Sequence, residues 1–257
     1  MKNYFFTLIL FFSIGFITAQ EDGVSNGATF IQVDYIKTVP GKNYGQILNE
    51  KWAKLAEKRI EEGTIVGWDA WWNMNSTDES NHDILLVTLL TDIDSIGAGA
   101  GIRRAFPEMS DDEVSEFNKK NREARKIVNT TIYKVVDNYF KQDSVPKIAL
   151  TNYMKVTHGD EFEYEKMEKE YKQTVEASGK AGWAVHKRVD RFGSGLNNNY
   201  MTVDFYNKMS EMMDERAPTF EMSEEQRENM MKSKNLEDTS TVTPIGILFL
   251  LDNLRNH

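Results

Sequence analysis

The chain has 257 residues, with 31 basic and 40 acidic side chains, a formal net charge of −9 and no cysteine. The absence of cysteine excludes disulfide bonds, a thiolate metal site and a lipid anchor attached to cysteine. The acidic balance argues against nucleic acid or an anionic membrane surface as a partner.

Residues 1–19 have the pattern of a cleavable secretory signal peptide. Lys2 supplies the positive start, an apolar run extends over residues 5–17, and Ala19 is the small residue before the expected cut. The run of 13 residues is shorter than the roughly 20 that a spanning helix needs, so an uncleaved anchor is the less favoured alternative. We expect export to the periplasm or the cell exterior without stable membrane insertion after cleavage, and residues 20–27 form a short linker.

The periodicity of residues 28–141 predicts strands and helices in the order βαββαβ. Apolar residues at helical spacing predict the first helix at 43–61, which Gly63 ends, and the capping box Ser110-x-x-Glu113 opens the second helix. The expected strands are 29–37, 64–73, 83–91 and 130–137.

Residues 142–257 repeat this order. The first helix is expected at 161–177, with Gly179 at its end, and the capping box Ser223-x-x-Gln226 opens the second helix. The expected strands are 147–156, 181–190, 199–206 and 244–251.

Four short motifs recur in the two halves in the same order. Tyr35 and Asp137 are 102 positions apart, and Tyr153 and Asp252 are 99 apart. Such agreement is hard to obtain by chance, so we infer an internal duplication of two ferredoxin-like repeats. The matched segments are Tyr35-x-Lys37-x-x-x-Gly41 with Tyr153-x-Lys155-x-x-x-Gly159, Gly67-Trp68 with Gly182-Trp183, Glu108–Asp112 with Glu221–Glu225, and Val135–Asn138 with Leu250–Asn253.

Each repeat thus reads as a ferredoxin-like unit. Two such units in one chain, with the shared Tyr-x-Lys and Gly-Trp motifs, resemble a fused, exported member of the dimeric α/β-barrel superfamily. The resemblance implies an α+β fold whose two units pair within the chain as a barrel, and hence a monomer. Relatives include antibiotic-biosynthesis-type monooxygenases, haem-degrading enzymes, chlorite dismutase-like haem proteins and stress-response barrels, so the fold does not fix the function.

The second strand of each repeat carries the most suggestive side chains. Alternation places Trp68 on one face and Asp69 with Trp71 on the other, and the repeats align His186 with Trp71. Because the halves differ here, we expect Trp71 and His186 near a ligand in an apolar cleft between sheet and helices. Trp68 and Trp183 are most simply core anchors between helix and sheet, although Trp183 is also a candidate for the cleft.

Asp34 and Asn152 occupy matching positions in the two first strands. These strands are central in the expected fold, so their polar side chains need partners if they are buried. A hydrogen-bonded structural role is slightly favoured, and a ligand-binding or base role is the alternative, because burial raises the pKa of a carboxyl group.

The chain has no motif typical of catalysis or cofactor binding, so catalytic residues remain unknown. His186 is the one histidine on an expected strand, where it could ligate a haem iron, as haem-binding relatives do. A structural histidine is favoured over this role. No cofactor and no metal site are otherwise predicted.

The leading hypothesis is an exported protein that binds a small hydrophobic or aromatic molecule. A haem-dependent or cofactor-free oxygenase is the second hypothesis, and a ligand-free protein that acts through its surface in the envelope is the third. An unfilled cleft beside Trp71 and His186 would favour the first hypothesis over the third.

Overall fold

The computed structural model describes residues 27–193, 196–216, 224 and 241–255. The expected signal peptide and the capping box at Ser223 therefore lie outside the described residues. Within the described part, no helix has the length and apolar character needed to cross a membrane.

The first unit follows the expected order, with its helical connections divided into short pieces. The first helix contains a π-helical segment, and Ser110 caps α4 through the expected capping box with Glu113. The elements are β1 (Phe30–Thr38), α1 (Tyr44–Ile47), the π-helical segment (Leu48–Trp52), α2 (Ala53–Glu61), β2 (Gly67–Asn73), β3 (Ile84–Leu90), a 3-10 turn (Ile93–Ser95), α3 (Ile102–Ala105), α4 (Asp111–Ala124) and β4 (Arg125–Phe140).

The second unit repeats the strands of the first. Its first helix matches the expected range, but the expected glycine end is wrong. Ser178 adopts an extended conformation there and its hydroxyl donates to the Val175 carbonyl at 2.9 Å, whereas Gly63 ends α2 with φ of 69° as expected. The elements are β5 (Ile148–Lys155), α5 (Glu161–Ala177), β6 (Gly182–Arg188), β7 (Tyr200–Tyr206), α6 (Met209–Arg216) and β8 (Thr241–Arg255).

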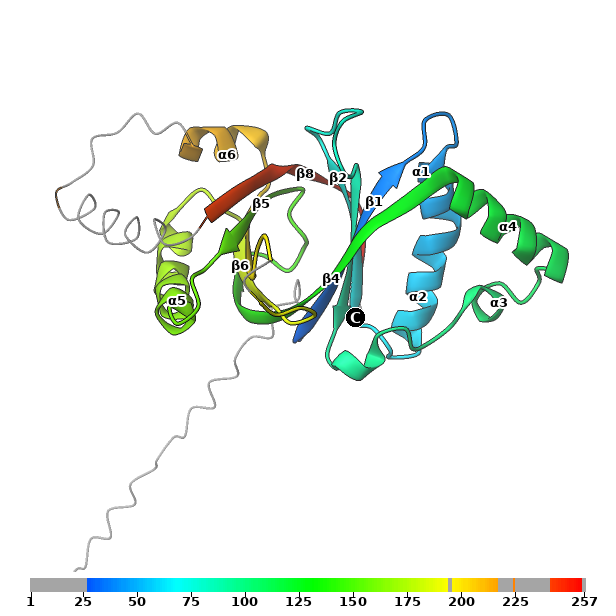
Figure 1. The fold of residues 1–257 in the computed structure, drawn as a ribbon, viewed down its shortest axis with the longest axis horizontal. Coiled ribbons are helices and arrows are strands. Elements are labelled where there is room, and N and C mark those ends of the chain that lie inside the picture. Colours follow the sequence, from blue (N-terminus) through cyan, green and yellow to red (C-terminus); the bar gives the residue numbers. More distant parts are fainter. Residues whose placement is uncertain (1–26, 194–195, 217–223, 225–240, 256–257) are drawn as a thin grey trace, which may run out of the picture.

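The eight strands form one closed antiparallel barrel. Their order is β1-β3-β2-β8-β5-β7-β6-β4, and β4 returns to pair with β1. Each unit therefore contributes a four-stranded sheet of the same internal order. The two sheets join where β2 pairs with β8 and where β4 pairs with β6. The helices of each unit cover the outside of its own sheet, on opposite sides of the molecule (Figure 1).

The last strand of each unit is about twice as long as its sequence predicts, because it belongs to both sheets. The first part of β4 pairs with β1 and its last part with β6, while β8 pairs first with β5 and then with β2. Both long strands have a bulge where they enter the other unit. The bulge skips Val136 in β4 and its repeat equivalent Leu251 in β8. The recurring Val135–Asn138 and Leu250–Asn253 segments are therefore the two joints between the units.

Strand alternation divides the apolar side chains into an inner core and outer cores. In β1, Val33 and Tyr35 are buried inside the barrel, whereas Ile36 packs outward with α2. Trp68 and Trp183 lie in the two outer cores, where each packs between a sheet and its helices. Their expected role as core anchors is confirmed.

Candidate ligand site inside the barrel

Trp71 and His186 face the interior of the barrel from β2 and β6. Both are buried, with exposed fractions of 3% and 6%. Asp69 lines the same interior cavity as Trp71, while Trp68 packs on the outer face, as the alternation predicted. The two repeat-equivalent positions therefore converge on one space, which lies between the two sheets and not between a sheet and its helices.

This space contains a cavity of about 100 Å³. Its wall is mainly aliphatic and aromatic, and the partly exposed Phe140 and Val145 lie at one end of it. The residues that line it are Ala28, Ile31, Val33, Asp69, Trp71, Leu85, Val87, Leu89, Val135, Asn138, Phe140, Val145, Ala149, Thr151, Ala184, His186, Met201, Val203, Phe205, Leu248 and Arg255.

His186 is the unusual polar group of this cavity. Its Nδ1 atom is buried and has no hydrogen-bond partner among the residues that the structure describes. Burial lowers the pKa of His186 to about 4, and a hydrogen bond with the Met201 backbone offsets only part of this shift. The imidazole is therefore neutral at pH 7, and an unpaired buried nitrogen of this kind is costly unless another group meets it.

A buried ion pair forms one wall of the cavity. The Arg255 guanidinium binds both carboxylate oxygens of Asp69, at 2.6 and 3.0 Å, and both side chains are at least nine-tenths buried. A bidentate pair satisfies the donors and acceptors that burial removes from water. The equivalent positions in the second unit hold Ala184 and Phe140, so the other wall is apolar.

The glycines of the two Gly-Trp motifs make room for these side chains. A Cβ atom at Gly67 would lie 3.1 Å from Cδ of Arg255, and one at Gly182 would lie 2.4 Å from Cδ1 of Phe140. Gly67 pairs with Arg255 across β2 and β8, and Gly182 pairs with Phe140 across β6 and β4. The repeated glycine therefore has the same packing role at both joints.

The other three sequence candidates do not reach this cavity. Asp34, Asn152 and Trp183 have the opposite strand parity and point outward from the barrel. Asp34 accepts hydrogen bonds from Gln32 Nε2 at 3.1 Å and from the Thr130 hydroxyl at 2.5 Å, so its favoured structural role agrees with the geometry.

Asp34 does line a separate groove of about 170 Å³ between the first sheet and α2. A space between sheet and helices therefore exists, but it holds neither Trp71 nor His186. The five candidates are split between two faces of the sheet and do not form one site.

Sequence reasoning missed Arg255 and Phe140 as cavity residues. Arg255 stands at the end of the chain, 186 positions from Asp69, and nothing local to either residue predicts that they meet. The only available signal was the repeated glycine, since glycine inside a strand often marks a close approach by another group.

The cavity does not fit a haem. Pockets for drug-sized ligands and cofactors have volumes of about 300–1,000 Å³, whereas the space beside His186 is about 100 Å³. Among the described residues, no group of three or more acidic or histidine side chains is placed to hold a metal ion.

Solved structures with very little sequence identity share this architecture. A candidate monooxygenase from Lactobacillus acidophilus NCFM superposes with a TM-score of 0.59 at 9% identity, over 89% of this chain and 97% of its own. A candidate monooxygenase from Fusobacterium nucleatum gives 0.52 at 11% identity, over 89% and 97%. A candidate chlorite dismutase gives 0.51 at 11% identity, over 88% and 95%.

No protein-family model matches the chain, and no curated protein matches it either. Structural likeness at these identities establishes the fold and leaves the activity open. The chain therefore has the ferredoxin-like dimeric α/β-barrel fold, with both sheets of the barrel supplied by one polypeptide.

Proposed function

We propose that this protein binds a small, mainly apolar molecule with one hydrogen-bonding group inside the barrel. The observation that carries the proposal is the buried Nδ1 of His186, which has no partner among the described residues and lies at an otherwise mainly apolar cavity. A ligand hydroxyl or N–H group would satisfy this nitrogen, and the apolar remainder of the ligand would contact Trp71 and the aliphatic wall.

The size of the cavity limits the ligand. An engineered cavity of about 150 Å³ in another protein binds benzene, and the space here is about 100 Å³. The ligand that fits is therefore about the size of a single six-membered ring, unless the partly exposed end near Phe140 widens on binding. This unfilled space also favours the binding hypothesis over a ligand-free protein.

A cofactor-free oxygenase is the second candidate, because structural neighbours include candidate monooxygenases. The chemistry of His186 argues for binding over catalysis. A general base works best when its pKa is near the working pH, and the pKa of His186 is lowered to about 4. Oxygen consumption by the purified protein with phenolic substrates would favour the enzyme.

Export, an internal duplication and a monomeric state are further parts of the proposal. The pattern of residues 1–19 supports delivery outside the cytoplasm. The four recurring motifs and the equivalent bulges at Val136 and Leu251 support an origin by tandem duplication. A monomer is proposed because β4 and β8 already make both contacts between the units within one chain.

Phenol and benzene test the proposal as a matched pair of probes. Phenol should bind about fivefold more tightly than benzene by titration calorimetry, since a hydrogen bond to a buried acceptor contributes on the order of 1 kcal/mol. His186→Leu should remove this difference. The NMR signal of the Trp71 indole N–H, assigned through Trp71→Phe, should shift on binding.

The indole signals of Trp68 and Trp183, which lie outside the barrel, provide the internal control. If neither probe binds, or if only these two signals move, the barrel interior is not the ligand site. Equal affinities for phenol and benzene would remove His186 from the proposal.

A further inference from the structure

A second cavity opens at the opposite end of the barrel, where β1 and β5 finish. It has a volume of about 470 Å³, with a floor of buried residues and an exposed rim that includes Asn81, Val128, Lys155 and Asn197. The residues that line it are Tyr35, Asn81, His82, Val128, Asn129, Thr131, Tyr133, Tyr153, Lys155, Asn197 and Asn198. It is more polar than the cavity beside His186 and includes three tyrosine hydroxyl groups.

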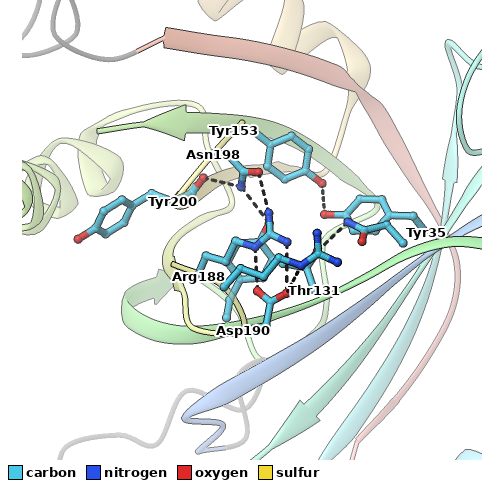
Figure 2. A network of polar contacts seen from close by, with 10 residues as sticks. Tyr35, Thr131, Tyr153, Arg188, Asp190, Asn198 and Tyr200 are labelled. Carbon is cyan, nitrogen blue, oxygen red and sulfur yellow. Dashed lines mark hydrogen bonds and ion pairs between the residues drawn. The ribbon is translucent and has the colours of Figure 1, made fainter. Parts of the chain in front are cut away.

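The orientation of Asn198 is fixed by its neighbours (Figure 2). The Arg188 guanidinium can only donate, so its Nη1 faces Asn198 Oδ1, at 3.4 Å. The Arg188 Nε and Nη2 donate to the two Asp190 carboxylate oxygens at 2.8 and 3.2 Å. The Asn198 amide nitrogen then donates to the Tyr133 hydroxyl at 3.1 Å and to the Tyr200 carbonyl at 3.3 Å.

Asn198 leads into a chain of three tyrosine hydroxyls. Tyr133 accepts from Asn198 and is also hydrogen-bonded to the Tyr35 hydroxyl. Tyr35 in turn hydrogen-bonds the Tyr153 hydroxyl, and either oxygen can be the donor. The three hydroxyls have three protons but share two hydrogen bonds with one another, so one proton is left over. It is the Tyr153 proton when Tyr35 donates to Tyr153, and no acceptor for it outside this chain occurs among the residues that the structure describes.

The side chains near the Tyr153 hydroxyl favour a negatively charged group as its hydrogen-bond acceptor. Lys155 is the charged residue among those that line the cavity, and no acidic residue lines it. The Nε2 of His82 is buried there without a partner among the described residues. Burial raises the pKa of Tyr35, Tyr133 and Tyr153, so all three hydroxyls keep their protons at physiological pH.

We propose that this cavity binds the carboxylate of a small organic acid, with the Tyr153 hydroxyl as its donor at the floor and Lys155 at the rim. Lys155 would attract the carboxylate at the rim, and the faces of the tyrosine rings and Val128 would contact a small carbon skeleton. This site is separate from the cavity beside His186 and does not depend on its ligand.

Benzoate, acetate and inorganic phosphate are the probes, each titrated calorimetrically into the purified protein. We expect benzoate to bind, and Tyr153→Phe to weaken it at least tenfold, because this change removes only the donor oxygen. Tyr44→Phe is the matched control, since the Tyr44 hydroxyl is also buried but lies on the outer face of the barrel. It should leave the affinity unchanged, and so should His186→Leu.

Lys155→Gln gives a second readout that does not disturb the floor. It should weaken benzoate binding and reduce the dependence of the affinity on salt. The proposal is overturned if benzoate does not bind to the wild-type protein, if Tyr153→Phe and Lys155→Gln both bind it normally, or if His186→Leu alone abolishes binding. Tighter binding of inorganic phosphate than of benzoate would also overturn the assignment to a carboxylate.

Discussion

The hydroxyl groups of Tyr35 and Tyr153 hydrogen-bond each other across the interior of the barrel. These residues hold the same place in the recurring Tyr-x-Lys-x-x-x-Gly motif, on β1 and β5, each an inner strand of its four-stranded sheet. Equivalent side chains that meet in this way mark the line about which the two units are related. The tyrosine of the motif is therefore explained by contact between the units, whereas Lys37 of the motif pairs with Asp83 within the first unit.

The tyrosine contact predicts a coupled effect on stability. Tyr35→Phe and Tyr153→Phe should each lower the free energy of unfolding by about 1–3 kcal/mol, because each leaves a buried hydroxyl without its partner. The double variant should cost less than the sum of the two, since it removes both partners. Urea unfolding of all four proteins measures the coupling, and strictly additive losses would contradict a direct contact.

The burial of His186 predicts a loss of stability in acid. The folded protein takes up this proton near pH 4, whereas an unperturbed histidine does so near 6.5. Between these values the unfolded state binds more protons, so stability should fall as the pH drops from 6.5 to 4, by about 3 kcal/mol in total.

His186→Leu should flatten this part of the stability profile, as measured by urea unfolding at a series of pH values. His158→Gln is the control, because the His158 side chain is fully exposed. A profile for His186→Leu that runs parallel to that of the wild-type protein would show that His186 is not held neutral by burial.

The ion pair between Asp69 and Arg255 can be exchanged for the residues of the other unit. Asp69→Ala alone should cost about 3–5 kcal/mol, because it leaves the Arg255 guanidinium buried without its carboxylate. Adding Arg255→Phe recreates the Ala184 and Phe140 pair and should recover most of this loss. The test is the free energy of unfolding of the single and double variants, measured with urea. A double variant no more stable than Asp69→Ala would show that the Ala184 and Phe140 pair cannot replace the ion pair.

The two glycines near the start of β6 should respond differently to a methyl group. Gly182→Ala places a Cβ 2.4 Å from the Phe140 ring and 2.9 Å from the Tyr139 carbonyl, so it should destabilise the protein by about 1–3 kcal/mol. Gly179→Ala has no atom within 4 Å and a backbone that alanine can adopt, so thermal unfolding should change little. Equal effects at both positions would contradict the packing role of Gly182.

The sequence predicted the elements well where local periodicity was strong, as in α5, β3 and β7. It underestimated β4, because residues 125–129 are mostly exposed and their two apolar residues, Ile127 and Val128, are adjacent and give no alternation to mark a strand. It placed Trp71 and Asp69 on one face and Trp68 on the other, since alternation is a property of the strand itself.

Which faces meet was decided by the closure of the barrel. Alternation separates the two sides of each strand, but it does not say which side becomes the interior. Because β2 pairs with β8 and β4 pairs with β6, Trp71 and His186 face one common cavity inside the barrel. Asp34 and Asn152 remain on the outside.

By itself, the sequence determined the two recurring units, their element order and the faces of their strands, because these depend on interactions between residues near in the chain. Only the tertiary structure decided the contact of Asp69 with Arg255, the tyrosine chain and the two cavities. Each of these joins residues from different strands or different units, and their distances depend on how the two sheets close around a common interior.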